Sequence, residues 1–396
     1  MAKSKFKSMM GEIHLWLGVA SGLVLFIVCL TGTILTFRLE IRHFLNDGWH
    51  VEVPANKEFL SINKVAWQVQ KAEKKGVKSI YVPAEDDKPY EYELRPEKGQ
   101  RFGKVLRINP YDGTVLSEGN PKIDDFFRTM TQLHRWLLLQ DVRYGEKKDI
   151  ILGRHIVGWS TVIFIIISLT GLILWWPKRW KQLKHGLKVK WNGSAYRLNY
   201  DLHNTLGFYT LPLCLLMAFT GLFWSFGWYR DAVEPIMGAK FGQAPFRPAK
   251  IERDKSKRLL SPEAAMEKAG LVIDHEHGTY ISYPRTRSGA ISVTQQAEGY
   301  EWMPYAENVY EIHSETGEIL NQQLFKDFTF GEKIANQIKP LHLGSFAGSF
   351  SKWIYFITCL IATSFPITGI IIWLKKLKIK RNKKQKLKKK KTLQDA

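Results

Sequence analysis

The chain has 396 residues, of which 45% are hydrophobic, 13% aromatic and 24% charged. This composition excludes a disordered or collagen-like chain, and three cysteines (Cys29, Cys214 and Cys359) cannot build a disulfide framework. The net charge of +21 gathers in short basic segments along the chain. Because nucleic-acid binding needs a basic patch on one folded surface, we do not expect a nucleic-acid partner.

Four long apolar segments are long enough to cross a bilayer, since about 20 helical residues span the roughly 30 Å hydrocarbon core. The expected membrane helices are residues 15–37, 152–176, 203–228 and 346–374. The basic segments are residues 1–14, 177–202 and 375–396, and they alternate with nearly neutral segments. Because cationic segments stay in the cytoplasm, both termini and the 177–202 loop are predicted to be cytoplasmic.

The two outward segments, residues 38–123 and 229–328, each have the pattern of a small α+β domain. In the first, helical spacing over Ser61–Lys75 precedes predicted strands at Val77–Val82, Tyr90–Leu94 and Val105–Ile108. In the second, a helix is predicted to begin at Ser261-Pro262-Glu263, where Ser is a cap and Pro occupies the first turn. Its strands are predicted near Thr279–Tyr283, Ala290–Thr294 and Val309–Ile312. Residues 124–151 and 329–345 are predicted to be interfacial segments that lead back to the membrane.

The chain contains an internal repeat. The segments that begin at His14 and His203 both read H-x-x-L-G-x12-T-G. Further along, Leu133-His134 parallels Leu341-His342, and Thr170-Gly171 parallels Thr368-Gly369. We interpret the chain as a duplication of a unit made of helix, outside domain and helix, whose two copies share one topology. A pseudo-twofold axis along the membrane normal is then expected.

Four of the eleven histidines recur in this repeat: His14 with His203 at one end of the spans, and His134 with His342 at the other. A twofold axis would bring each pair face to face, and two opposed imidazoles are the axial ligands of a b-type haem. We therefore predict two haem b sites, one near each membrane face, with Gly18, Gly207 and Gly344 leaving room for the macrocycle.

Two alternatives remain open at this stage. His155, at the outer start of the second span, could replace His134, although it has no counterpart in the repeat. Single histidines at span ends can also be interfacial residues without a ligand. His275 and His277, which flank Glu276, are expected to be solvated in a loop. No G-x-G-x-x-G follows a predicted strand, so no bound nicotinamide or flavin is expected.

The sequence resembles the PepSY-associated transmembrane proteins, often described as iron-regulated membrane proteins. The resemblance covers almost the whole chain and rests on motifs such as His14-x-Trp-Leu-Gly18, Leu133-His-Arg-Trp-Leu137 and Thr170-Gly-Leu-Ile-Leu-Trp-Trp-Pro177. It implies two periplasmic PepSY-like domains, location in the bacterial inner membrane and haem ligation by the repeated histidines. Some members of the family reduce ferric siderophores. Arg135 and Arg154 are candidate partners of haem propionates, because guanidinium suits carboxylates.

The leading hypothesis is a haem-dependent electron-transfer protein, a ferric-chelate reductase. A cytosolic or quinol donor would reduce the inner haem, and electrons would pass through the outer haem to a ferric siderophore or another ferric chelate. The alternative is a non-enzymatic membrane protein whose PepSY-like domains bind or regulate a periplasmic partner, with the histidines purely structural.

Overall fold

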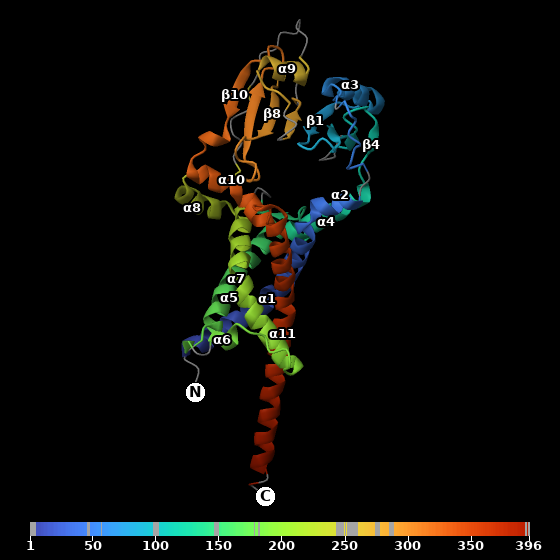
Figure 1. Cartoon of the computed structure of the whole chain (residues 1–396). Coiled ribbons are helices and arrows are strands. Elements are labelled where there is room, and N and C mark those ends of the chain that lie inside the picture. The colour runs from blue at the N-terminus through green and yellow to red at the C-terminus, as the bar shows by residue number, and fades with distance from the viewer. Residues whose placement is uncertain are drawn as a thin grey trace. The chain divides into compact units, whose positions relative to one another are not determined.

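A computed structural model of the chain describes residues 5–45, 48–56, 58–97, 103–145, 150–177, 179–180, 183–242, 249, 251, 260–273, 278–284, 289–392 and 394 (Figure 1). The chain folds into two compact units, which we call the membrane unit and the sheet unit. The membrane unit holds residues 1–37, 127–232 and 339–396, and the sheet unit holds residues 38–126 and 233–338.

Four helices of the membrane unit are long and apolar enough to cross a bilayer. They are α1 (Lys5–Thr36), α5 (Leu152–Trp175), α7 (Ala195–Ser225) and α11 (Gly348–Thr392). Helix α1 packs against α5 and α11, and α7 packs against the same two, so the four form a closed bundle (Figure 1). Large apolar side chains such as Leu23 and Leu169 point outward, as expected where lipid is the solvent.

Three of the four helices extend beyond the predicted spans at the basic end of the bundle. Helix α1 begins at Lys5, α7 begins at Ala195, and α11 continues to Thr392. Ser194 caps α7 by accepting a hydrogen bond from the backbone N–H of Arg197 at 3.3 Å. Apolarity marks where a helix can cross hydrocarbon and does not mark where it ends, because Lys and Arg are good helix formers in water. Short α6 (Leu183–Gly186) lies in the loop between α5 and α7.

The sheet unit contains one eight-stranded antiparallel sheet in the order β10-β9-β8-β7-β1-β2-β3-β4. The strands of the first half are β1 (Val77–Val82), β2 (Tyr90–Leu94), β3 (Val105–Ile108) and β4 (Val115–Ser117). Those of the second half are β7 (Thr279–Ser282), β8 (Ile291–Gln296), β9 (Glu307–Ile312) and β10 (Ile319–Gln323). The predicted strands are confirmed to within a few residues, whereas β4 and β10, one on each edge of the sheet, were missed.

The two outward segments were expected as two domains, but the structure joins them into one sheet. Strands β1 and β7 pair antiparallel, with Ile80 opposite Ile281 and Val82 opposite Thr279. All four of these residues are fully buried. Pairing satisfies the N–H and C=O groups that two separate sheets would each leave open along an edge strand.

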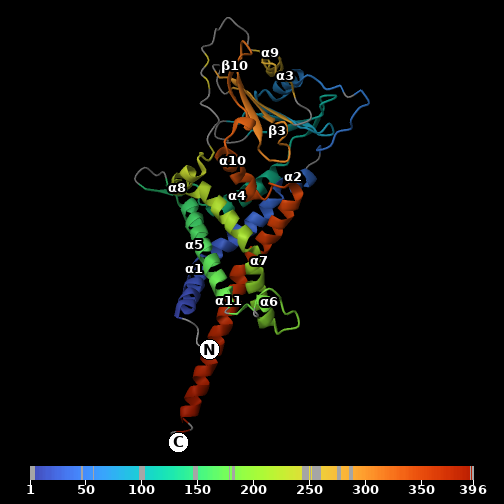
Figure 2. The same cartoon turned by 60° about the vertical axis from the view of Figure 1, so that its left-hand side comes forward.

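Helices α3 (Ile62–Glu73) and α9 (Pro262–Lys268) contact each other over this sheet (Figure 2). Ser61 and Ser261 cap them, and Glu263 of α9 also accepts hydrogen bonds from Ser61 Oγ at 2.6 Å and from the backbone N–H of Ile62 at 2.5 Å. The second half therefore helps to cap helix α3 of the first half.

The remaining elements lie near the places where the chain passes between the two units, or within one unit. They are α2 (Arg38–Leu45), α4 (Pro121–Trp136), the hairpin β5 (Arg143–Tyr144) and β6 (Ile150–Ile151), α8 (Gly227–Met237), the short 3-10 helix η2 (Phe325–Asp327) and α10 (Phe330–Leu343). Helices α4 and α10 lead back into the membrane unit and carry His134 and His342. Apart from the β5–β6 hairpin in the first half and η2 in the second, the described elements of each half follow the same order: long helix, short helix, helix, four strands, helix and long helix.

Candidate functional site: two facing histidine pairs

The first histidine pair lies toward the basic end of the bundle. His14 on α1 and His203 on α7 face each other with ring centroids 6.4 Å apart and ring planes at 87°. Both side chains are partly buried. Phe365 of α11 lies edge-on to His203 at 5.4 Å. The structure thus brings together two residues separated by almost half of the chain.

The second pair lies toward the opposite end. His134 on α4 and His342 on α10 have ring centroids 6.2 Å apart and planes at 60°. Burial lowers the pKa of both imidazoles, and burial together with the neighbouring His134 imidazole lowers that of His342 to about 4. Both rings are therefore neutral near pH 7, the form in which imidazole binds a metal.

Each imidazole is held by a Thr-Gly dipeptide on a membrane helix of its own half of the chain. The Nδ1 atom lies near the threonine Oγ1 in all four cases, at 3.2 Å for His14, 2.7 Å for His203, 3.3 Å for His134 and 3.1 Å for His342. The corresponding dipeptides are Thr170-Gly171, Thr368-Gly369, Thr31-Gly32 and Thr220-Gly221.

The glycine of each dipeptide gives the imidazole room to lie flat on the helix. A Cβ atom built on Gly171 would lie 3.2 Å from His14 Cε1, and one on Gly221 would lie 3.1 Å from His342 Cε1. The matching distances are 3.3 Å at Gly32 and 3.5 Å at Gly369. A side chain at Gly171, Gly221 or Gly32 would push against the ring, whereas a Cβ atom at Gly369 would be in ordinary contact with it.

The hydrogen bonds define which ring nitrogen is free. Nδ1 lies 2.9 Å from Ile167 O in His14, 2.9 Å from Val28 O in His134 and 3.0 Å from Met217 O in His342. A carbonyl oxygen can only accept, so Nδ1 carries the proton and donates. Nε2 then carries the lone pair, and no hydrogen bond of Nε2 occurs among the described residues. This is the arrangement that orients histidine ligands in metal sites.

The same tautomer follows for His203 from its threonine. Thr368 Oγ1 donates to the backbone carbonyls of Ser364 and Phe365, at 3.0 and 3.2 Å. Because the hydroxyl proton of Thr368 is used in these hydrogen bonds, Thr368 Oγ1 can only accept from His203, and Nδ1 of His203 therefore carries the proton and donates.

The ring separations are within about 0.1 Å of those expected if one iron ion lay between the rings of each pair. A metal–imidazole bond of about 2.0–2.1 Å and a distance of about 1.15 Å from nitrogen to ring centre predict centroids about 6.3–6.5 Å apart. The observed separations are 6.4 and 6.2 Å. No cluster of three or more His, Cys, Asp or Glu suited to a metal occurs in the part of the chain that is described. A metal here would need its other ligands from outside the protein, as a porphyrin provides.

The two pairs lie well apart along the bundle. Eighteen residues of α1 separate His14 from Gly32, which contacts His134, and eighteen residues of α7 separate His203 from Gly221, which contacts His342. At 1.5 Å per residue this corresponds to about 27 Å. The pairs therefore lie near opposite ends of a helix segment about as long as a bilayer core is thick.

One cation accompanies each pair. Lys376 of α11 interacts electrostatically with both His14 and His203, and Arg135 with both His134 and His342. The Arg135 guanidinium also lies over the Trp136 ring at 4.6 Å. A carboxylate of a bound cofactor would be attracted to either cation. The sequence singled out Arg135 but missed Lys376, because Lys376 is one of twelve basic residues in the tail.

Other predicted site residues lie elsewhere. His155 contacts Tyr144 and Phe226 edge-on, at 5.8 and 5.6 Å, and no second imidazole faces it among the described residues. Arg154 lies in the first turn of α5, with no ion pair in the described part of the chain. His275 and His277 lie outside the described residues.

The predicted role of Gly344 is wrong. A Cβ atom at this position would lie 2.4 Å from the ring of Tyr355, so the residue packs tightly and leaves no room for a macrocycle. Its positive φ of 73° shows that it is a turn glycine following α10. Gly18 has open space around a built Cβ, and Gly207 has one neighbour at 4.0 Å.

Comparison with known proteins agrees with this architecture. Residues 12–376 match the model of the PepSY-associated TM region, a match that includes α5 and α7, most of α1, the apolar part of α11 and both histidine pairs. No curated protein matches the chain. The resemblance noted from the motifs is confirmed, and the chain belongs to the PepSY-associated TM region family.

Proposed function

We propose that the chain is a haem b protein that carries electrons across a membrane to a ferric chelate. The observation that carries this proposal is the pair of facing imidazoles at each end of the bundle, each with its Nδ1 tied back to a helix. His14 with His203 and His134 with His342 would hold the iron of two haems. A bound haem supplies one-electron chemistry by cycling between Fe(III) and Fe(II).

The residues of the chain have three roles in this proposal. The four histidines position the metal, and the Thr-Gly dipeptides fix the imidazole orientation and the protonated nitrogen, which also raises the basicity of the ligand. Arg135 and Lys376 attract propionate carboxylates, with Arg154 a further candidate at the outer site. The surrounding apolar helices keep water and bulk ions away.

The orientation follows from charge. We propose that the basic end of the bundle faces the cytoplasm of a bacterium, with both termini and the 177–202 loop inside and the sheet unit in the periplasm. The repeated order of elements supports an origin by duplication, in which each copy contributes one PepSY-like half of the sheet.

The choice of a ferric siderophore or similar chelate as electron acceptor is supported by the family resemblance. Reduction to Fe(II) lowers the ion's charge and weakens its hold on hard oxygen ligands.

Purified protein provides the test. The protein is reduced anaerobically with dithionite, freed of excess reductant and mixed with a hydroxamate ferric chelate and a colorimetric Fe(II) trap. We expect the reduced haem bands to disappear as Fe(II) forms, one iron for each haem oxidised. A reduced protein that oxygen reoxidises but ferric chelates do not would refute the reductase proposal. A protein without haem would refute the cofactor as well and would favour the binding-module alternative.

A further inference from the structure

A cavity of about 330 Å³ opens at the basic end of the membrane unit. It lies between the end of α5, the loop that contains α6 and the first turns of α7, and Trp175 and Trp176 form an aromatic wall. Its volume falls in the range of about 300–1,000 Å³ typical of small-molecule sites. None of the residues that line it belongs to the sheet unit.

Two residues of the loop beside the cavity, Gly186 and Leu187, are held in place by hydrogen bonds. The Gly186 carbonyl accepts hydrogen bonds from Trp175 Nε1 at 3.2 Å and from Thr205 Oγ1 at 3.1 Å. Tyr209 donates to Leu187 O at 3.1 Å, and Trp175 stacks on Phe208 with ring centroids 3.8 Å apart. These contacts hold this part of the wall in place, which reduces the entropy that a ligand must lose on binding.

Two charged groups in the wall form an ion pair with each other, and a third donates to a backbone carbonyl. Buried Asp201 accepts hydrogen bonds from Arg197 Nε at 2.9 Å and from the backbone N–H of Lys190 at 3.3 Å. Lys7 Nζ donates to Trp176 O at 2.6 Å. Because Arg197 is paired with Asp201 and Lys7 is hydrogen-bonded to the backbone, we expect a neutral ligand to fit this cavity better than an anionic headgroup.

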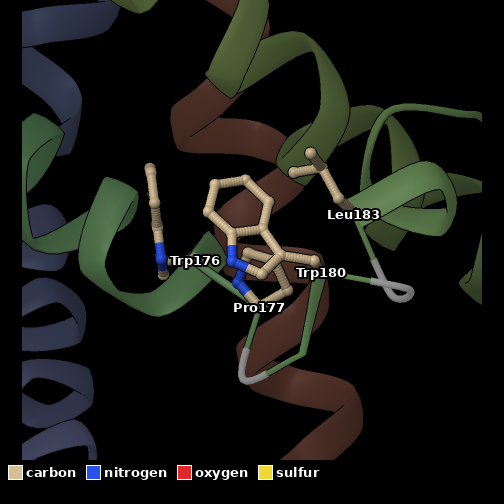
Figure 3. Close-up of a pocket in the computed structure, with 4 residues that line it drawn as sticks. All are labelled: Trp176, Pro177, Trp180 and Leu183. Atoms are coloured by element: carbon tan, nitrogen blue, oxygen red, sulfur yellow. The ribbon is translucent and has the colours of Figure 1, made fainter.

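Three polar side chains in the wall lack a hydrogen-bond partner among the described residues: His185, Tyr200 and Asn204. They offer an imidazole, a phenol and an amide to a ligand with hydroxyl or carbonyl groups at its two ends. An apolar recess adjoins the cavity and shares Trp176 and Pro177 with it. Figure 3 shows Trp180 over Pro177 in this recess, with Trp176 and Leu183 on either side. The recess suits an alkyl chain that continues toward lipid.

The cavity is close to the inner histidine pair. Asn204 directly follows His203, and Leu174 lies one helical turn beyond Gly171, on which His14 packs. Adjacent Cα atoms are about 3.8 Å apart and one helical turn rises about 5.4 Å. A ligand in contact with Asn204 and Leu174 is therefore within electron-transfer reach of a group held between His14 and His203.

We propose that this cavity binds a membrane quinol, whose ring lies against Trp175 and Trp176 and whose hydroxyls bond to His185 and Asn204. This inference rests on the proposed function, for which it identifies the electron donor. Oxidation of one quinol breaks two O–H bonds. One proton goes to a free nitrogen of His185 and the other to water at the open side. The two electrons leave singly to the one-electron haem acceptor that His14 and His203 would hold, which must pass the first electron on before it accepts the second.

The test compares His185→Phe and Asn204→Leu with a control, Trp191→Phe. Trp191 lies at the same end of the bundle, is 71% exposed and does not line the cavity. Two quantities are measured on protein in nanodiscs: binding of decylubiquinone by quenching of tryptophan fluorescence, and the anaerobic rate of haem reduction by decylubiquinol. We expect both cavity variants to bind at least tenfold more weakly and to be reduced at least tenfold more slowly. Haem content, reduction by dithionite and the control should be unchanged.

The outcomes separate this inference from the proposed function. Haem-loaded cavity variants that bind quinone and accept electrons as the wild type does would overturn the quinol site and leave the haem proposal intact. Displacement of quinone by an equimolar anionic phospholipid would instead identify a lipid headgroup site. If the purified protein holds no haem but binds quinone at this cavity, the ligand site stands and its role as electron donor is refuted.

Discussion

The threonines that hold the inner pair differ in a way that predicts unequal effects of the same substitution. His14 Nδ1 has two acceptors, Ile167 O at 2.9 Å and Thr170 Oγ1 at 3.2 Å. For His203 the acceptor is Thr368 Oγ1, at 2.7 Å. Thr170→Val leaves a carbonyl in place, whereas Thr368→Val removes the hydrogen bond that orients His203. Both variants also remove a hydroxyl that donates to a backbone carbonyl of its own helix. Each variant therefore controls for the effect of losing that intrahelical hydrogen bond in the other.

The expected loss of haem affinity can be taken from other metal sites. Removing a group that hydrogen-bonds to a metal ligand weakens metal binding about 10–100-fold, or about 1.4–2.8 kcal/mol. Thr368→Val should therefore weaken haem retention at the inner site by about this factor. Thr170→Val should lose about 0.5 kcal/mol, roughly a twofold effect. The assay is transfer of haem to excess apomyoglobin, followed in the Soret band. Equal losses in the two variants, or no loss in either, would show that the threonines do not orient the imidazoles.

Three further predictions concern other parts of the chain. Gly221→Leu should displace the His342 ring and reduce the haem-to-protein ratio by about half, with the inner site still low-spin, because a Cβ atom alone comes within 3.1 Å of the imidazole. Lys376→Met should lower the midpoint potential of the inner haem by a few tens of millivolts in a redox titration, because the lost positive charge favoured the reduced state; a rise would contradict this electrostatic role. Ile80→Ala should destabilise the sheet unit by about 2–4 kcal/mol in a denaturant titration, since this fully buried residue lies at the β1–β7 junction, and an effect confined to one half would argue against one sheet.

Local patterns predicted much of the fold. The apolar segments of about 20 residues gave the four membrane helices, and strand patterns gave six of the eight strands in the large sheet. The pairing of β1 with β7 was not predictable in this way, because it joins residues about 200 positions apart. The alternation of buried and exposed residues within a strand is the same whether the strand pairs with a neighbour on both sides or lies at the edge of a sheet.

The histidine sites, too, were predicted only in part, because their contacts join residues that are distant in the sequence. Their repeat positions predicted which imidazoles come together, since a twofold axis relates equal depths in the two halves. The Thr-Gly dipeptides were visible as repeat markers, yet the histidine that each one holds depends on how the helices pack. For example, His134 contacts Thr31-Gly32 more than 100 residues earlier. The prediction that Gly344 makes room for a macrocycle was wrong for a related reason. A small residue near a histidine can make room for a ligand or, as here, for a neighbouring side chain, the ring of Tyr355.

The most direct test of the central claim is the haem content of the purified chain together with its electron paramagnetic resonance spectrum. The facing imidazoles predict two low-spin haems b per chain, falling to one after His14→Ala and to one after His134→Ala, with His155→Ala unchanged. A protein that is colourless, or one that keeps its full haem complement in both of the first two variants, would contradict the account.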